Sequence, residues 1–431
     1  MFKTFKEAWK VAELRSKILF TLLILVLFRI GCAVPVPYFD GSYLELMNNI
    51  FGSGSTFGYL NLMSGSALAN GTLFALSISP YITAQIIIQL LTIAIPTLER
   101  WSKEGEEGQK KLQSLTRYGT VVLAVVTAIG YYALLNANGV IAVPDGISKG
   151  FAAVVIIATY TAGASLVMWL AEKINEHGIG NGISLLLFAG IVSGMPYMIV
   201  NFASYYTALW VKVLVWVATL VVFIIAIAFI VFVTESERRI PVQYAKKVVG
   251  RKMYGGQNSN LPIKLNMSGV MPFIFAQSIV SIPSTLQMIF HPKEGGVAEA
   301  IFNAFAPGSL IYIILLFVLI IAFAYFYLAI SFNPVEVANN LQKNGGTVFG
   351  IRPGKPTADY IRRVVNRITL IGALFLSIIA IVPMVLPAIY EPLGAIALGG
   401  TSLLIAVGVA LETARELEAQ MTMRNYKGFL E

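Results

Sequence analysis

Ten long apolar runs alternate with polar stretches along this chain of 431 residues. They cover residues 18–34, 73–95, 117–137, 151–171, 183–203, 211–233, 269–290, 310–332, 368–387 and 393–412. A helix of about 20 apolar residues crosses a bilayer, so the pattern predicts ten transmembrane helices. The basic residues within the runs, Arg29, Arg117 and Lys212, lie toward a run end, where a long side chain can reach the interface.

The interiors of these runs hold no Asp, Glu or His. Ionisable groups inside a helix bundle underlie proton relays, voltage sensors and ion-coupled carriers. The pattern therefore argues against a protein driven by protons or voltage and favours one that is passive or powered by a partner. Composition agrees with the membrane class, because charged residues make up 12% of the chain, against about 25% in soluble domains. The single cysteine, Cys32, excludes an internal disulfide.

Positive charge predicts the orientation of the spans. If the amino terminus is cytosolic and the spans alternate, most Lys and Arg residues fall on the cytosolic side. The outer side then keeps Lys149, Lys212 and Lys293. This imbalance satisfies the positive-inside rule and predicts a multi-pass membrane protein with both termini in the cytosol.

The longest predicted external loop, residues 35–72, is rich in Gly and Ser but also carries scattered apolar residues. Its apolar stretches are too short to cross a membrane, yet the segment is too apolar for an ordinary solvated loop. Irregular backbone at membrane depth is tolerated where protein surrounds it. Two interpretations stay open: a short helix at about 58–70 that dips back into a protein-lined cavity, or a helix that lies flat on the interface.

An internal repeat relates the two parts of the chain. The stretch from Pro80 to Ile87 (PYITAQII) matches Pro272 to Ile279 (PFIFAQSI), and the stretch at 182–187 (GISLLL) matches that at 400–405 (GTSLLI). Both matches fall five spans apart, so the paired helices cross the membrane in opposite directions. This is typical of two halves related by a twofold axis in the membrane plane. We expect halves at 1–205 and 206–431.

The repeated segments carry bulky aliphatic side chains rather than ligand groups. Such side chains either pack the bundle or form a constriction that excludes water. Gln85 and Gln277 are candidates for interhelical hydrogen bonds. Pro80, Pro272 and Pro283 are expected to weaken their helices.

The loops 234–268 and 333–367 are longer than a helix connection needs. Ile240, Val242 and Tyr244 alternate with other residues, which predicts a strand and a β-hairpin. Arg352 lies in a turn-rich stretch far from either span. Basic projections of this kind suit RNA phosphates or an acidic protein face; the alternative is a solvated loop that obeys the charge rule.

Several motifs together resemble those of the SecY family, in its bacterial form. They are Gly178–Ser184 (GIGNGIS), Pro80–Leu91 (PYITAQIIIQLL), Arg238–Pro241 (RRIP), Gly350–Gly354 (GIRPG) and Gly399–Ile405 (GGTSLLI). The resemblance implies an all-α membrane protein with ten transmembrane helices in two inverted halves of five and a re-entrant plug helix. It also implies a channel subunit that moves unfolded polypeptides across the membrane and releases apolar segments sideways into lipid.

The resemblance assigns four groups of site residues. The pore ring comprises Ile78, Ile82, Ile183, Leu187, Ile274 and Ile405. The plug comprises Leu60, Met63, Ser64, Gly65 and Leu68. The lateral gate comprises Thr83, Gln85, Gln89, Gln277, Ser278 and Ser281. Docking of the motor or ribosome falls to Arg238, Arg239, Lys246, Lys247, Arg251 and Arg352.

The implied partners are the SecE and SecG subunits, the SecA motor, the ribosome, the translocating polypeptide with its signal peptide, and anionic lipid. No cofactor, metal or catalytic residue is expected. A secondary solute transporter with inverted repeats is the alternative, although coupling carboxylates are missing from the runs. An intramembrane enzyme would need an acid pair, a Ser–His pair or a metal-binding set within the spans, whereas His177 and His291 fall in loops on opposite sides.

Overall fold

The computed structural model describes residues 7–40, 43, 47, 58–144, 146–204, 208–244, 247–249, 252–254, 258–267, 269–290, 296–306, 308–389 and 394–427. The helices are α2 (Ala12–Gly31), α4 (Gly58–Met63), α5 (Ser79–Ala94), α6 (Pro96–Lys103), α7 (Glu106–Ala137), α8 (Lys149–His177), α9 (Gly182–Ser204), α10 (Leu209–Glu235), α11 (Met271–Val280), α12 (Ile282–Phe290), α13 (Val297–Ala304), α14 (Leu310–Ser331), α15 (Pro334–Lys343), α16 (Lys355–Ile389) and α17 (Gly394–Lys427). The strands are β1 (Glu237–Tyr244), β2 (Lys247–Val249), β3 (Lys252–Tyr254), β4 (Asn258–Lys264) and β5 (Gly346–Val348).

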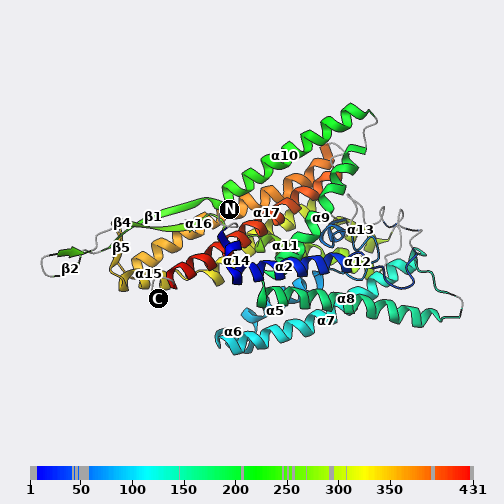
Figure 1. Cartoon of the computed structure of the whole chain (residues 1–431), viewed down its shortest axis with the longest axis horizontal. Helices are drawn as coiled ribbons and strands as arrows, with labels where there is room; N and C mark the ends of the chain where they lie inside the picture. Colours follow the sequence, from blue (N-terminus) through cyan, green and yellow to red (C-terminus); the bar gives the residue numbers. More distant parts are fainter. Residues whose placement is uncertain are drawn as a thin grey trace.

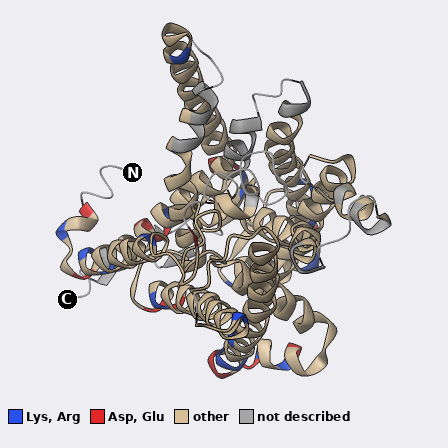
Figure 2. Cartoon of the chain, turned by 90° about the vertical axis from the view of Figure 1, so that its right-hand side faces the viewer, with Lys and Arg blue, Asp and Glu red and all other residues tan. Residues whose placement is uncertain are grey.

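The helices form an elongated bundle with a small sheet projecting from one end (Figure 1). Each of the ten predicted runs contains a helix or a broken pair of helices. Along the bundle, tan ribbon predominates and charged residues are sparse, as Figure 2 shows from the end opposite the sheet. The predicted all-α membrane fold is confirmed, with the sheet confined to the long loops.

Five described helices are long and apolar enough to cross a membrane by themselves: α7, α8, α10, α14 and α16. α5 and α6 pass the same test together, with a bend of 102° between them. α2 carries four charged residues among its 20, and the run at 269–290 is divided between α11 and α12. The number of spans is consistent with ten, which stays a prediction.

The prediction that Pro80 and Pro272 weaken their helices is wrong, whereas Pro283 lies just after the break between α11 and α12. Pro80 and Pro272 lie in the first turn, of α5 and α11 respectively. A missing N–H costs nothing at that position, because the first amide groups of a helix have no internal partner. The two prolines therefore start equivalent helices in the two parts of the chain.

The order of helix contacts repeats along the chain. α5 contacts α7, α7 contacts α8 and α8 contacts α9; in the same order α11 contacts α14, α14 contacts α16 and α16 contacts α17. This repetition supports two halves of like construction. The expected boundary between residues 205 and 206 lies outside the described residues.

The halves meet along two lines. On one, α9 packs against α17; on the other, which we call the seam, α5 contacts α11 and α7 contacts α12. The amino-terminal helix also reaches the other half, because Lys17 Nζ donates to Gln420 Oε1 at 3.4 Å. Both chain ends lie near the end of the bundle that bears the sheet (Figure 1).

The predicted β-hairpin is confirmed, since β1 pairs antiparallel with β4. The second long loop joins the same sheet: β5 pairs with β1 to give the order β4-β1-β5. Ile240 and Val242 of β1 point into a buried cluster that also holds Val348 of β5 and Ile361 of α16. The two loops thus form one folded unit.

Candidate functional site

The six predicted pore-ring residues all lie in one buried apolar cluster. Ile78 caps the start of α5 and Ile82 lies in its first turns, while the others come from α9, α11 and α17. Each is at most 7% exposed, and all six belong to one buried cluster. Aliphatic side chains from four helices therefore pack together, with no ionisable group among them.

The predicted plug packs against this cluster, although its helix is shorter than expected. α4 ends at Met63 and the chain continues in turns. The Ser64 hydroxyl donates to Asn61 O at 2.8 Å, and Gly65 and Ser66 adopt φ values of 65° and 69°. A left-handed backbone at two consecutive residues cannot continue a right-handed helix.

The plug residues fall into two buried clusters. Leu62, Met63 and Ala67 belong to the same cluster as the pore-ring side chains. Leu68 and Ala69 belong to a second cluster with the outer parts of α7 and α8. Leu60 is partly buried against this second cluster, and Ser64 and Gly65 are buried. The segment therefore lies inside the protein, as the re-entrant interpretation expected, rather than flat on a surface.

The six predicted gate residues differ in what they contact. Thr83, Ser278 and Ser281 donate hydrogen bonds to carbonyls of their own helix or of its end. Buried Gln277 donates to the Tyr312 hydroxyl of α14, within the same half. Gln85 and Gln89 line a groove of about 610 Å³, whose wall includes Ile330 from beyond the seam.

Across this groove the Tyr327 hydroxyl of α14 donates to Gln89 Oε1 at 3.3 Å. Tyr327 also packs against the rings of Phe275 and Phe326. Sequence reasoning missed Tyr327, because its partner is 238 positions away. The only hint of a polar contact in the sequence was this hydroxyl group within an otherwise apolar run.

The predicted docking residues lie in or beside the sheet. Arg238 and Arg239 are exposed on β1, where Arg239 Nε pairs with Glu237 Oε1 at 2.8 Å. Arg352 is exposed in the turn between β5 and α16. Lys247 begins β2, whereas Lys246 and Arg251 lie outside the described residues.

An ion pair at the base of the sheet ties it to the bundle. Arg415 of α17 donates from Nη2 to Glu235 Oε1 at 2.7 Å and to Thr234 O at 3.1 Å. Burial lowers the pKa of Lys264 on β4, and the nearby Arg415 cation lowers it further. The end of α10 is thereby fixed to α17.

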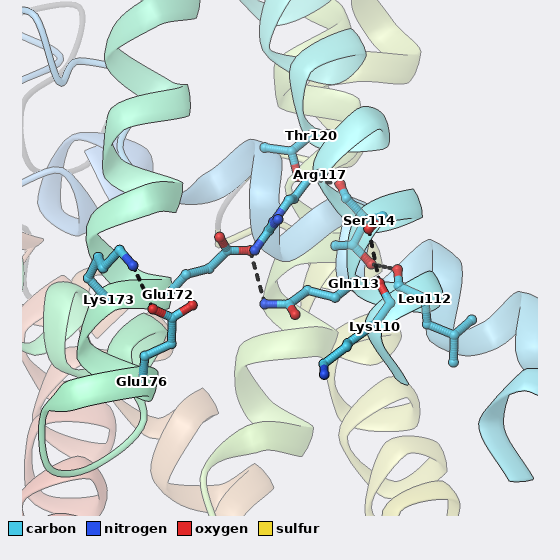
Figure 3. A network of polar contacts seen from close by, with 10 residues as sticks. Lys110, Leu112, Gln113, Ser114, Arg117, Thr120, Glu172, Lys173 and Glu176 are labelled. Atoms are coloured by element: carbon cyan, nitrogen blue, oxygen red, sulfur yellow. Dashed lines mark hydrogen bonds and ion pairs between the residues drawn. The ribbon is translucent and has the colours of Figure 1, made fainter. Parts of the chain in front are cut away.

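A second polar network was missed by sequence reasoning. Glu172, in the last two turns of α8, accepts hydrogen bonds from Arg117 Nε at 2.8 Å and from Gln113 Nε2 at 3.2 Å (Figure 3). Its side chain is 5% exposed, against 44% for that of Arg117. Glu172 directly follows an apolar run, and nothing in the sequence near it marks it as buried. The network joins α7 to α8.

Fold and site together define a polytopic helical membrane protein whose two halves share a buried apolar cluster. Residues 72–414 match the SecY family. The chain is 42% identical to the protein translocase subunit SecY of Streptomyces scabiei and 41% identical to that of Halalkalibacterium halodurans, in each case over the full length of both chains. The chain belongs to the SecY family, which confirms the resemblance seen in its motifs.

Solved structures share the fold. One described as a protein conducting channel superposes with a TM-score of 0.64, covering 94% of this chain and 92% of that one at 20% identity. Sec61 in the canine ribosome–channel complex from the endoplasmic reticulum gives a TM-score of 0.61 with the same coverage and identity.

Proposed function

We propose that this chain is the protein-conducting subunit of a Sec translocase in the plasma membrane. Unfolded polypeptides cross through the centre of the bundle, and apolar segments leave through the seam into lipid. One observation carries the proposal: six aliphatic side chains from four helices are buried in one apolar cluster together with Leu62, Met63 and Ala67 of the plug segment. The full-length similarity to protein translocase subunits supports it.

In this proposal Ile78, Ile82, Ile183, Leu187, Ile274 and Ile405 form the ring around the translocating chain. Aliphatic side chains can close against water and give way to any sequence, because they offer no selective polar contact. The segment from Leu60 to Leu68 is the plug that rests on this ring. The seam, with Gln89 and Tyr327 facing each other across it, is the lateral gate.

Energy comes from partners rather than from the bundle. The sheet that the two long loops build presents Arg238, Arg239 and Arg352 to the solvent. We assign this surface to the SecA motor and the ribosome, with the signal peptide entering at the gate. SecE and SecG complete the complex. The basic face toward the cytosol also suits anionic lipid. The protein itself performs no catalysis in this scheme.

The test is translocation by purified components. Proteoliposomes that contain this chain with its two small subunits, supplied with motor and ATP, should protect a secretory precursor from external protease. Liposomes that contain the same complex but receive no motor serve as the control. Saturable uptake of a small solute by the chain alone, without precursor protection, would instead identify a carrier and overturn the proposal.

A further inference from the structure

Where α4 ends, a run of carbonyl groups is left without helical partners. The amides of Ser64, Gly65 and Ser66 use the carbonyls of residues 60–62. The carbonyls of the following residues face outward, as the last carbonyls of any helix do. The buried carbonyls of Met63, Ser64 and Gly65 need donors from elsewhere in the fold. That of Leu68 accepts from the Gly71 amide at 3.3 Å and has a second lone pair for another donor.

Four side chains outside the plug supply these donors. Ser77 Oγ donates to Met63 O at 3.5 Å, Cys32 Sγ to Ser64 O at 3.8 Å, Arg29 Nη1 to Gly65 O at 3.5 Å, and the Tyr131 hydroxyl to Leu68 O. They come from α2, from the chain just before α5, and from α7. The donors therefore surround the segment on several sides and contact its main chain.

The remaining side of the plug meets main chain directly. A Cβ atom at Gly190 of α9 would lie 2.5 Å from Met63 O, which is closer than real Cβ contacts. A Cβ atom at Gly65 would lie 2.4 Å from Arg29 Nη1 and 3.0 Å from Gly190 O. No side chain fits between the plug and α9 here, so the fit depends on two glycines.

We propose that this set of donors, Arg29, Cys32, Ser77 and Tyr131, is a seat that grips the plug by its carbonyl groups and sets how readily it leaves. The inference rests on the proposed function of the segment as a plug and names the groups that hold it. Because the grip acts on main chain, the plug's own side chains can vary while the seat still holds. Release of the plug breaks these hydrogen bonds.

Tyr131 is the strongest member of the seat. Its side chain is fully buried in the second cluster, and its ring meets that of Tyr160 edge-on at 5.0 Å between centroids. The ring is thus fixed with its hydroxyl on Leu68 O. The hydrogen bond to Leu68 O is therefore lost when the plug moves.

The test uses the native thiol as a reporter. Cys32 is the only cysteine of the chain, is 5% exposed and contacts the plug, so a small maleimide should reach it when the plug is displaced. In the assembled complex, Tyr131→Phe keeps the ring and removes one hydrogen bond, which should raise the resting labelling rate about fivefold. Tyr132→Phe, at the next residue of the same helix, should label at the wild-type rate. Complexes are compared at equal amounts of folded, assembled protein.

A second arm separates this inference from the proposed function. A precursor arrested in the wild-type channel should also accelerate labelling of Cys32, since a plug must leave its place. If engagement accelerates labelling but Tyr131→Phe labels like wild type, the seat is refuted and the plug stands. If Cys32 stays protected in the engaged complex, the segment is not a plug that moves, and both ideas fall.

Discussion

Removal of the Tyr327 hydroxyl should make the seam between the halves easier to open. In the closed structure this hydroxyl donates to Gln89 Oε1 and so joins α14 to α5 across a groove. Tyr327→Phe keeps the ring and its contacts with Phe275 and Phe326. The substitution therefore isolates the hydrogen bond from the packing.

The size of the effect follows from the geometry. At 3.3 Å the bond is longer than the 2.5–3.0 Å usual for hydroxyl donors, so it belongs in the lower part of the range measured for neutral hydrogen bonds, about 0.5–1 kcal/mol. The ratio of open to closed seam should rise about two- to fivefold. A central leucine contributes about 0.3–0.6 kcal/mol to membrane insertion. A test segment should therefore enter lipid with about one to three fewer leucines.

The assay measures the fraction of a segment with graded leucine content that integrates rather than crosses. The matched control is Tyr325→Phe, which removes a hydroxyl bonded to Asn366 O within the same half. Gln89→Leu should lower the threshold as Tyr327→Phe does, and the double variant should add little. An unchanged threshold in Tyr327→Phe, equal to that of Tyr325→Phe, would refute the reasoning.

Three further predictions concern the ring, the sheet and the buried carboxylate. Replacing Ile82 and Ile274 together by Gly opens the constriction, so the resting channel should leak ions in planar bilayers; unchanged conductance counts against the ring. Arg352→Glu should impair motor-driven translocation in an inserted, assembled complex, whereas Lys355→Glu, at the start of α16, should leave it intact; normal secretion by the first variant removes Arg352 from docking. Glu172→Gln should lower the free energy of unfolding by about 1–3 kcal/mol, because a buried charged hydrogen bond is lost, while exposed Glu176→Gln should change it by less than about 1 kcal/mol; equal thermal stabilities in detergent would contradict this.

The features set by apolar patterning could be predicted from sequence. The runs form helices because lipid offers the backbone no hydrogen-bond partners, so each segment must pair its own N–H and C=O groups. The six pore-ring residues came from the resemblance and not from patterning, because an aliphatic side chain on a membrane helix can face lipid as well as the bundle interior. The strand at Ile240 and Val242 was visible because burial on one face of a sheet follows a period of two.

Features that depend on distant partners could not be predicted. Tyr327, Tyr131 and Glu172 meet groups that lie 238, 63 and 55 positions away, and nothing local marks such a pair. The plug helix was predicted to extend to about residue 70, but the local hydrogen bond of Ser64 and the backbone of Gly65 end it at Met63. The three residues of β5 are too few to show a strand pattern.

The shared sheet has a mechanical consequence. β1 and β4 lead out of α10 and back toward α11, and β5 stands between α15 and α16, so these strands link consecutive helices of the second half. A force on either loop acts through the β1–β5 pairing on α10, α11, α15 and α16 together. The strands of this sheet do not connect α5, α7, α8 or α9. We therefore expect a partner that binds the sheet to move the second half as a unit relative to the first half.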